Sequence, residues 1–196
     1  MKSYIKFYEE ELYPLQDGIL KIVRDLKLPF YLTGGTALSR YYFKHRYSDV
    51  IELFVNSDSS YPEYVKRLTE SLINQPPEFY SFLSERFVKS EDYTQIYVER
   101  VSVILKIDLV NDIELHFGEF AEDKTLGKVD SWRNILSNKI TAAFRMEIKD
   151  FIDIWCISEH NTFNWVEIFN EAKRKDPGGR SYFAIRSFQK FSLRKS

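Results

Sequence analysis

Hydrophobic residues recur at helical spacing early in the chain. Over residues 12–27 the apolar positions fall three and four residues apart, which predicts an amphipathic helix with Pro14 in its first turn. The same pattern predicts a helix over residues 61–75, ended by the Pro-Pro pair that follows. Between these helices, FYLTGG reads as a short buried strand, and TALSRYYFK as a helix with Thr36 near its N-cap.

Alternating apolar and polar residues predict strands in the middle of the chain. In DVIELFV, residues 49–55, alternation places Val50 and Glu52 on one face and Asp49 and Ile51 on the other. Three more strand candidates follow, around ERFVKS, YTQIYVER and SVILKIDLV.

The pattern becomes helical after Asp130. SWRNILSNKITAAFR, DFIDIWCISEH, NWVEIFNEAKRK and RSYFAIRSFQKF all carry helical periodicity, and AEDKTLGKVD before them reads as a loop. We therefore expect an α+β protein. It would have an N-terminal α/β lobe with a mixed sheet over residues 1–120 and a C-terminal helical lobe over residues 121–196.

Composition narrows the class of protein. The chain has 196 residues, of which 44% are hydrophobic and 29% charged, and this profile is typical of a soluble globular protein. The net charge of −1 argues neither for nor against a nucleic-acid partner. A single cysteine, Cys156, excludes an internal disulfide framework, and the scattered histidines argue against a structural zinc site. No signal-peptide core or membrane-length apolar run is visible, so we expect a cytoplasmic location.

The glycine pair Gly34–Gly35 lies between a predicted strand and a predicted helix. Glycines at such a junction let the backbone approach a ligand and leave N–H groups open to an anion. The simpler alternative is a tight turn that needs glycine for its geometry alone.

Two acidic residues lie in otherwise apolar strands. Asp108 is flanked by apolar residues, with Lys106 on its own face, and a carboxylate in such a strand needs a partner or a metal. Glu52 and Asp108 could meet across neighbouring strands and hold a divalent cation. The alternative is an edge strand whose acids face water.

Charged residues also gather in LSNKITAAFRMEIKDFIDIW. Lys139, Arg145 and Lys149 would supply cations for a triphosphate, and Asp150 and Asp153 share a helix face. The alternative for each residue is a solvated, charged helix face.

Basic residues recur every fourth position near the C-terminus. Arg186, Lys190 and Arg194 would form one basic helix face, which we interpret as a contact for RNA phosphates. An ordinary solvated surface helix would carry the same pattern.

Three segments in this order carry a family resemblance. FYLTGGTALSRYYFKHRYSDVIELFVN, LKIDLVND and NILSNKITAAFRMEIKDFIDIW together resemble the AbiEii/AbiGii toxin family of nucleotidyltransferases, within the DNA polymerase β-like superfamily. The resemblance extends from about Tyr13 to Lys175. It implies transfer of a nucleoside monophosphate from a nucleoside triphosphate to an RNA acceptor, the 3′ end of tRNA in characterised relatives. It also implies a toxin of a toxin–antitoxin or phage-defence system, with a separately encoded antitoxin as partner.

The resemblance assigns roles to individual residues. An Asp-x-Asp pair would hold two Mg²⁺ ions that stabilise the entering and leaving oxygens. We also expect the triphosphate between the two lobes, because the glycine turn opens a helix whose N-terminus attracts anions and Lys139 comes from the other lobe. Asp108 matches the third carboxylate, and Lys139 a phosphate-contacting lysine. The nucleotide-binding residues implied are Gly34, Gly35, Thr36, Lys139, Asp150 and Asp153, and the catalytic ones are Glu52, Asp108 and Lys139.

The chain departs from the family pattern at the metal-binding pair itself. Val50 stands at the first aspartate position and Glu52 at the second, while Asp49 occupies the variable position before them. Loss of a bridging ligand removes several kcal/mol of transition-state stabilisation. One hypothesis is a nucleotidyltransferase with a degenerate metal site, in which Glu52 and Asp108, or Asp49 brought in by a strand bulge, hold the Mg²⁺. The alternative is an inactive member that binds nucleotide, RNA or an antitoxin, so the sequence leaves open whether the chain is an enzyme.

Overall fold

The computed structural model describes residues 4–113 and 115–176, which form two compact units. Of the described residues, 4–113 and 121–129 belong to the first unit, and 115–120 and 130–176 to the second. All strands among the described residues lie in the first unit, and the second is helical, which confirms the α+β class. The expected division at residue 120 differs from this one, because residues 121–129 pair with the sheet.

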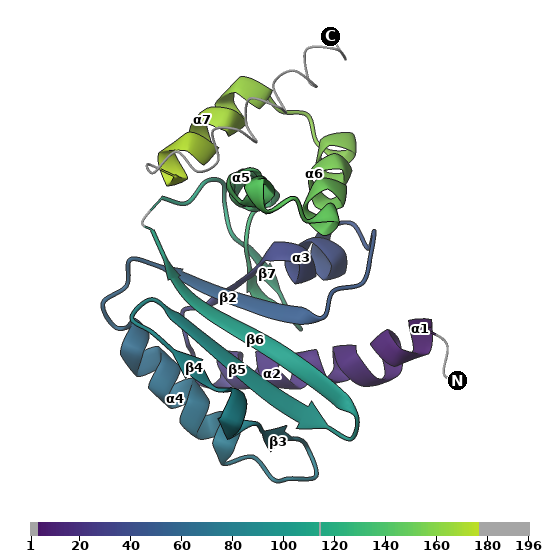
Figure 1. The fold of residues 1–196 in the computed structure, drawn as a ribbon, viewed down its shortest axis with the longest axis vertical. Helices are drawn as coiled ribbons and strands as arrows, with labels where there is room; N and C mark the ends of the chain where they lie inside the picture. The colour runs from purple at the N-terminus through teal and green to yellow at the C-terminus, as the bar shows by residue number, and fades with distance from the viewer. Residues whose placement is uncertain (1–3, 114, 177–196) are drawn as a thin grey trace. The chain divides into compact units, whose positions relative to one another are not determined.

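A mixed sheet organises the first unit (Figure 1). Its strand order is β3-β5-β6-β2-β1-β8-β7, and β4 pairs with β5. The pairs β2–β6 and β1–β8 are parallel, and the other pairs are antiparallel. The strands are β1 (Tyr31–Thr33), β2 (Val50–Asn56), β3 (Ser81–Phe82), β4 (Val88–Lys89), β5 (Tyr93–Arg100), β6 (Val103–Asp112), β7 (Ala121–Asp123) and β8 (Gly127–Val129).

Helices of the first unit follow the predicted apolar periodicity. Pro14 stands in the first turn of α2, as expected. The short helix after β1 begins at Gly34 with Thr33 as N-cap, so the expected N-cap role of Thr36 is wrong. The helical segments are α1 (Tyr4–Phe7), the π-helix η1 (Tyr8–Leu12), α2 (Tyr13–Asp25), α3 (Gly34–Ala37), the π-helix η2 (Leu38–Tyr42), α4 (Tyr61–Ile73) and the 3₁₀ turn η3 (Ser84–Arg86).

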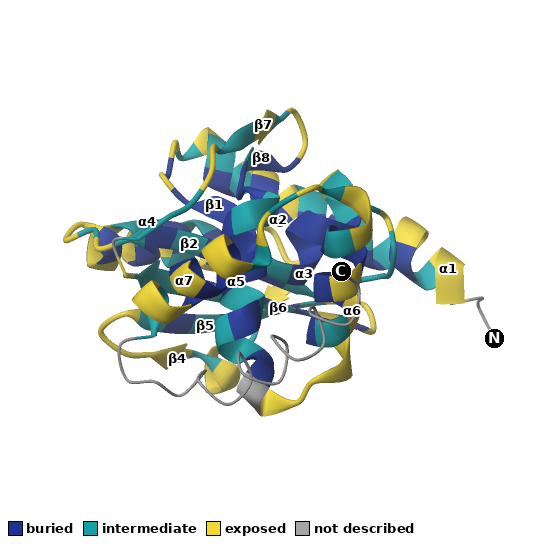
Figure 2. Cartoon of the chain, turned by 90° about the horizontal axis from the view of Figure 1, so that it is seen from above, coloured by how far each residue is buried: buried dark blue, intermediate teal, exposed yellow. Residues whose placement is uncertain are grey.

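Alternation of burial along most of their length gives the central strands two different faces (Figure 2). In β2, Ile51 and Leu53 are buried, whereas Val50 and Glu52 are half-buried. The buried face is covered by α4, whose Tyr61 hydroxyl donates a hydrogen bond to the carbonyl of Leu109, at 2.9 Å. The opposite face therefore carries the polar side chains.

A hairpin replaces the loop expected over AEDKTLGKVD, so that expectation is wrong. β7 and β8 pair through a turn in which the Asp123 carboxylate accepts hydrogen bonds from the N–H groups of Thr125 and Leu126. β8 then adds to the main sheet, since Val129 pairs with Leu32. Strands of three residues are too short to produce a readable alternation, so only the tertiary pairing reveals them.

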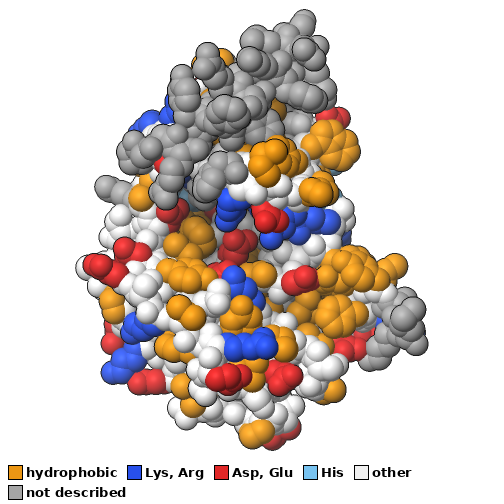
Figure 3. All heavy atoms as spheres, viewed as in Figure 1, with side chains coloured by type: hydrophobic (Ala, Val, Ile, Leu, Met, Phe, Trp, Pro, Cys, Tyr) orange, Lys and Arg blue, Asp and Glu red, His pale blue; other side chains and the backbone are white. Residues whose placement is uncertain are grey.

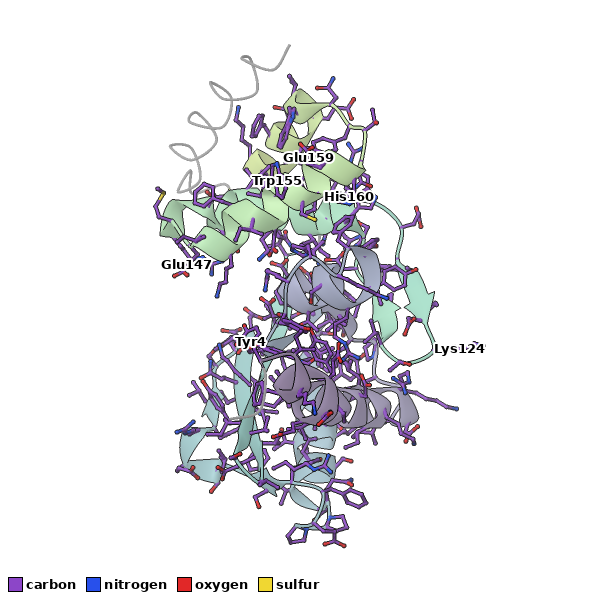
Figure 4. All side chains as sticks on the ribbon, turned by 90° about the vertical axis from the view of Figure 1, so that its right-hand side faces the viewer. Tyr4, Lys124, Glu147, Trp155, Glu159 and His160 are labelled. Atoms are coloured by element: carbon purple, nitrogen blue, oxygen red, sulfur yellow. The ribbon has the colours of Figure 1, made fainter. Side chains whose placement is uncertain are left out.

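The described residues of the second unit form the helices α5 (Trp132–Ala142), α6 (Ile148–His160) and α7 (Trp165–Lys175), with the 3₁₀ turn η4 (Ala143–Arg145) after α5. Ser131 caps α5 and Asn164 caps α7, each accepting a backbone N–H. Along α6, Cys156 is buried, whereas Trp155 is 61% exposed. Figure 4 labels Trp155 together with Glu159 and His160 of the same helix. None of the described helices combines the length and apolarity that crossing a membrane requires.

The buried Tyr61 hydroxyl offers a test of how α4 is held on the sheet. Tyr61→Phe should lower the free energy of unfolding by about 1–2 kcal/mol, because the Leu109 carbonyl and the Thr94 hydroxyl lose their partner away from water. Tyr64→Phe is the matched control, since its bond to Asp58 is only part-buried and water can replace it. Urea denaturation of both variants measures the difference, and equal effects would contradict the packing described.

Candidate functional site

Glu52 and Asp108 lie side by side on two parallel strands. The register of β2 and β6 pairs Glu52 with Asp108, and both belong to the half-buried face of the sheet. On the neighbouring strands, Thr33 of β1 pairs with Glu52 and Gln95 of β5 pairs with Asp108, so the four residues form one row across the sheet. The pairing arises because both strands alternate with the same period, so side chains in register share a face.

Asp108 is held by three neighbouring side chains. Lys106 Nζ lies 2.8 Å from one carboxylate oxygen, and the Tyr93 hydroxyl donates to the other at 2.8 Å. Gln95 Nε2 donates to that second oxygen at 3.3 Å and to the Tyr93 hydroxyl at 2.6 Å. Burial lowers the pKa of Lys106, but the hydrogen bond and the charge of Asp108 outweigh it and leave the pKa raised. Burial and the bond to Asp108 raise the pKa of Tyr93.

Glu52 reaches the glycine turn that follows β1. Its Oε2 accepts a hydrogen bond from the backbone N–H of Gly35, at 3.3 Å. Gly34 has a φ of +66°, and a Cβ added there would lie 1.8 Å from Glu52 Oε2. The turn therefore needs glycine at position 34 both for its backbone conformation and for the space that the carboxylate fills.

The segment before β2 closes around the same turn. A Cβ at Gly35 would lie 2.2 Å from Arg46 Nη2, so the guanidinium packs directly against this glycine. The buried Thr36 hydroxyl bonds the Ser48 hydroxyl at 2.9 Å and also the Val50 carbonyl. Thr36 thus ties the turn to the start of β2, and its hydroxyl is directed into the protein.

Asp49 points away from the half-buried face. It is exposed, and one of its oxygens accepts a hydrogen bond from the hydroxyl of Tyr8 in η1. Tyr8 is stacked on Tyr47, with ring centroids 4.3 Å apart. Burial and the bond to Asp49 raise the pKa of the Tyr8 phenol. Asp49 precedes β2, whose pairing with β6 runs from Val50 to Asn56 without a bulge.

The residues present do not fit a two-metal centre. Such a centre needs a carboxylate that bridges both ions, and Val50 occupies the position one pleat before Glu52. Across the sheet, Val50 pairs with Lys106, whose ammonium group is already bound to Asp108. Among residues 4–113 and 115–176, no three His, Cys, Asp or Glu side chains cluster as metal ligands.

The second unit holds the other charged residues that the sequence singled out. Lys139 Nζ lies 2.7 Å from Asp150 Oδ1 and 2.9 Å from Asp153 Oδ2, and both aspartates are buried. Arg145 lies 3.4 Å from the second oxygen of Asp150, whereas Lys149 is exposed. Lys139 therefore links α5 to α6 through a buried ion-pair network.

Comparison with known proteins adds the family. The model of the family described as nucleotidyl transferase AbiEii toxin, type IV toxin–antitoxin system, matches residues 20–176. The chain belongs to the AbiEii nucleotidyltransferase toxin family. No curated protein sequence matches it.

Solved structures share the fold. A Helicobacter pylori protein described as a nucleotidyltransferase is 18% identical, with a TM-score of 0.58, over 94% of this chain and 84% of its own. JHP933 from the same species is 14% identical, with a TM-score of 0.59, over 98% of this chain and 97% of its own. MenT4, a nucleotidyltransferase toxin from Mycobacterium tuberculosis H37Rv, is 14% identical, with a TM-score of 0.65, over 86% of this chain and 64% of its own. Each shows that the AbiEii family chain has a nucleotidyltransferase fold.

Some expected contacts of this AbiEii chain stay predictions. Gly34 and Gly35 belong to the first unit and Lys139 to the second, and a triphosphate shared by them is still an expectation. Arg186, Lys190 and Arg194, with the helix expected over residues 180–191, lie outside the described residues. On the face drawn in Figure 3, the basic and acidic side chains that are shown are interspersed rather than gathered into one large basic patch.

Sequence reasoning missed several residues of the site. Tyr93 and Gln95 bond Asp108, and their alternation in YTQIY was the available signal, since it places them on one face of β5. Arg46 lies in the HRYSD motif but received no role, and its packing on Gly35 depends on a chain reversal that no local pattern encodes. The contact of Tyr8 with Asp49 joins residues far apart in the sequence.

Replacement of Gly34 by alanine tests the fit of Glu52 to the turn. Gly34→Ala should lower the free energy of unfolding by roughly 2–4 kcal/mol, because it adds left-handed strain and a clash with the carboxylate. In a Glu52→Ala background the loss should fall to about 1–2 kcal/mol, since only the strain is left. Gly18→Ala in α2 is the control and should stabilise slightly, because a Cβ there meets nothing within 4 Å. An equal loss with and without Glu52 would contradict this geometry.

Removal of the Lys139 ammonium tests the ion-pair network of the second unit. Lys139→Met should lower the free energy of unfolding by about 3–5 kcal/mol, because two buried carboxylates lose the charge between them. Lys21→Met removes an exposed ion pair with Asp25 and should change the free energy of unfolding by less than about 0.5 kcal/mol. Urea denaturation of the two variants measures both values. An effect of Lys139→Met as small as that of Lys21→Met would show that Lys139 does not stabilise the unit.

Proposed function

We propose that this AbiEii family member binds a nucleoside triphosphate at the Glu52–Asp108 face and does not support efficient nucleotide transfer. By the Glu52–Asp108 face we mean the half-buried side chains of the central strands, namely Val50, Glu52, Tyr93, Gln95, Lys106 and Asp108. The RNA acceptor of the family, the 3′ end of a tRNA, would then be bound or passed over without rapid modification. A separately encoded antitoxin is the proposed protein partner, in keeping with the toxin–antitoxin description of the family.

The observation that carries the proposal is the number and arrangement of carboxylates. Glu52 and Asp108 are neighbours in register, but the position one pleat before Glu52 holds the methyl groups of Val50. A valine can neither ligate a cation nor accept a proton. Nucleotidyl transfer in two-metal enzymes relies on electrostatic stabilisation of the entering and leaving oxygens, so the missing carboxylate removes the largest contribution.

The state of the remaining carboxylates supports the same proposal. Asp108 is engaged by Lys106, Tyr93 and Gln95, and Glu52 by the N–H of Gly35. These bonds give each acid a partner within the protein. The chemistry that this chain's own residues can supply is therefore binding and orientation. A bound nucleotide would share the Gly35 N–H with Glu52 and the Lys106 ammonium with Asp108, and Arg46 brings a further cationic group to the turn.

Restoring the missing carboxylate tests the proposal. The double change Val50→Asp with Glu52→Asp should create Mg²⁺ binding and raise nucleotide transfer by roughly two orders of magnitude or more over the parent. Each new side chain is similar in size to the one removed or smaller, so the strand should keep its packing. The assay is incorporation of label into a tRNA pool from each of the four nucleoside triphosphates, with Mg²⁺ binding followed by calorimetry.

Two further variants make the result specific. Val110→Asp with Glu52→Asp adds a carboxylate to β6 on the face that carries Asp108, but away from position 50. This variant should transfer nucleotide no faster than the parent. Asp108→Asn in the restored variant should abolish the gain. Robust transfer by the parent would overturn the proposal, because Val50 would then be compatible with catalysis. No transfer by a folded, nucleotide-binding restored variant would show that the loss extends beyond this pair.

A further inference from the structure

The Glu52 carboxylate occupies the side of the glycine turn that faces the sheet. Its Oε2 lies 3.3 Å from the Gly35 nitrogen and fills the space where a side chain at Gly34 would begin. The backbone N–H of Gly35 is therefore already bonded to an anion that belongs to the protein. A phosphate oxygen approaching the same N–H would meet both an occupied donor and a like charge.

The length of the side chain explains why Glu52 reaches the turn. β1 and β2 are antiparallel neighbours, and Glu52 pairs with Thr33, the last residue before Gly34. A glutamate at this place extends one methylene further than an aspartate, which carries its charge beyond the strand and onto the turn. An aspartate on the same backbone would keep its carboxylate closer to β2.

The other charged side chains nearby differ from Glu52 in what they contact. Asp108 is paired with the ammonium of Lys106 at 2.8 Å, which offsets its charge. Asp49 faces away from the sheet and is bonded to Tyr8. Arg46 packs on Gly35 and brings a positive charge to the turn. Glu52 is thus the acidic side chain of the Glu52–Asp108 face that contacts the backbone donor itself.

We propose that the Glu52 carboxylate occupies the place at the Gly34–Gly35 turn that a nucleotide phosphate would take. It would therefore set how tightly the site binds a metal-free polyphosphate. Bound nucleotide and the Glu52 carboxylate compete for the N–H of Gly35. This inference rests on the proposed nucleotide binding, and it makes Glu52 a specificity-determining residue that disfavours anionic ligands. Removing its charge should therefore strengthen binding, whereas removing a residue that holds the ligand would weaken it.

Calorimetric titration in the presence of EDTA tests the competition. The probes are ATP, GTP, CTP, UTP and inorganic triphosphate, titrated into the full chain and into Glu52→Gln, Glu52→Ala and Glu52→Asp. The dissociation constant should fall roughly tenfold for the glutamine and alanine variants, because the competing charge is gone. It should fall less for Glu52→Asp, which keeps the charge but shortens the side chain.

A control and a second measurement separate the competition from general electrostatics. Glu99→Gln removes one negative charge from the same face of β5, four residues beyond Gln95, and should change the dissociation constant less than twofold. The chain has 7 glycines, so selective glycine labelling gives a simple amide spectrum. Triphosphate should shift the Gly35 amide signal of Glu52→Gln at concentrations that leave the parent signal unchanged. Thermal unfolding establishes that each variant is folded.

Three results would overturn the inference in different ways. Equal dissociation constants for the parent and the folded Glu52 variants would show that the carboxylate does not compete, while nucleotide binding itself would stand. Weaker binding by Glu52→Gln and Glu52→Ala would make Glu52 a group that holds the ligand. No binding of any probe by any folded variant would remove both the competition and the proposed nucleotide binding.

Discussion

The parallel pairing of β2 with β6 is the constraint on which the first unit depends. These strands are far apart in the sequence, and their register places Glu52 beside Asp108 and Val50 beside Lys106. A slip of one residue would exchange the two faces and bury the charged side chains in place of Ile51 and Leu53. The apolar face covered by α4 therefore enforces the register that brings the polar groups together.

Charge balance within this face distinguishes the chain from a complete two-metal centre. A half-buried carboxylate without a partner is unstable, and a metal ion is one way to supply the partner. Lys106 supplies it for Asp108 within the protein, and the glycine turn supplies a donor for Glu52. Val50 belongs to the same face and carries no charge.

The second unit follows the same principle with different groups. Lys139 of α5 lies between Asp150 and Asp153 of α6, and the two aspartates are almost fully buried. A buried ion pair contributes little net stability compared with apolar packing, but its partial removal is strongly destabilising. The residues that the family resemblance assigns to the nucleotide thus join two helices of the second unit.

The sequence by itself determined most of the secondary structure and the family of the chain. Alternation in VIELFV and helical spacing over residues 12–27 are strong local signals. In each segment one face is buried, so apolar residues recur at the period of the secondary structure. The family was likewise readable from three short segments, because a motif is a local pattern. The presence of Lys106 on the face of Asp108 followed from period-two spacing alone.

Tertiary structure decided which groups meet. The hydrogen bonds of the site join separate segments of the chain. They link Tyr93 and Gln95 to Asp108, Gly35 to Glu52, and Tyr8 to Asp49. The β7–β8 hairpin also escaped the sequence pattern, because strands of three residues form only when β1 offers an edge to β8. Contacts of this kind depend on strand register and chain reversal, which are properties of the whole packed sheet rather than of any short run of residues.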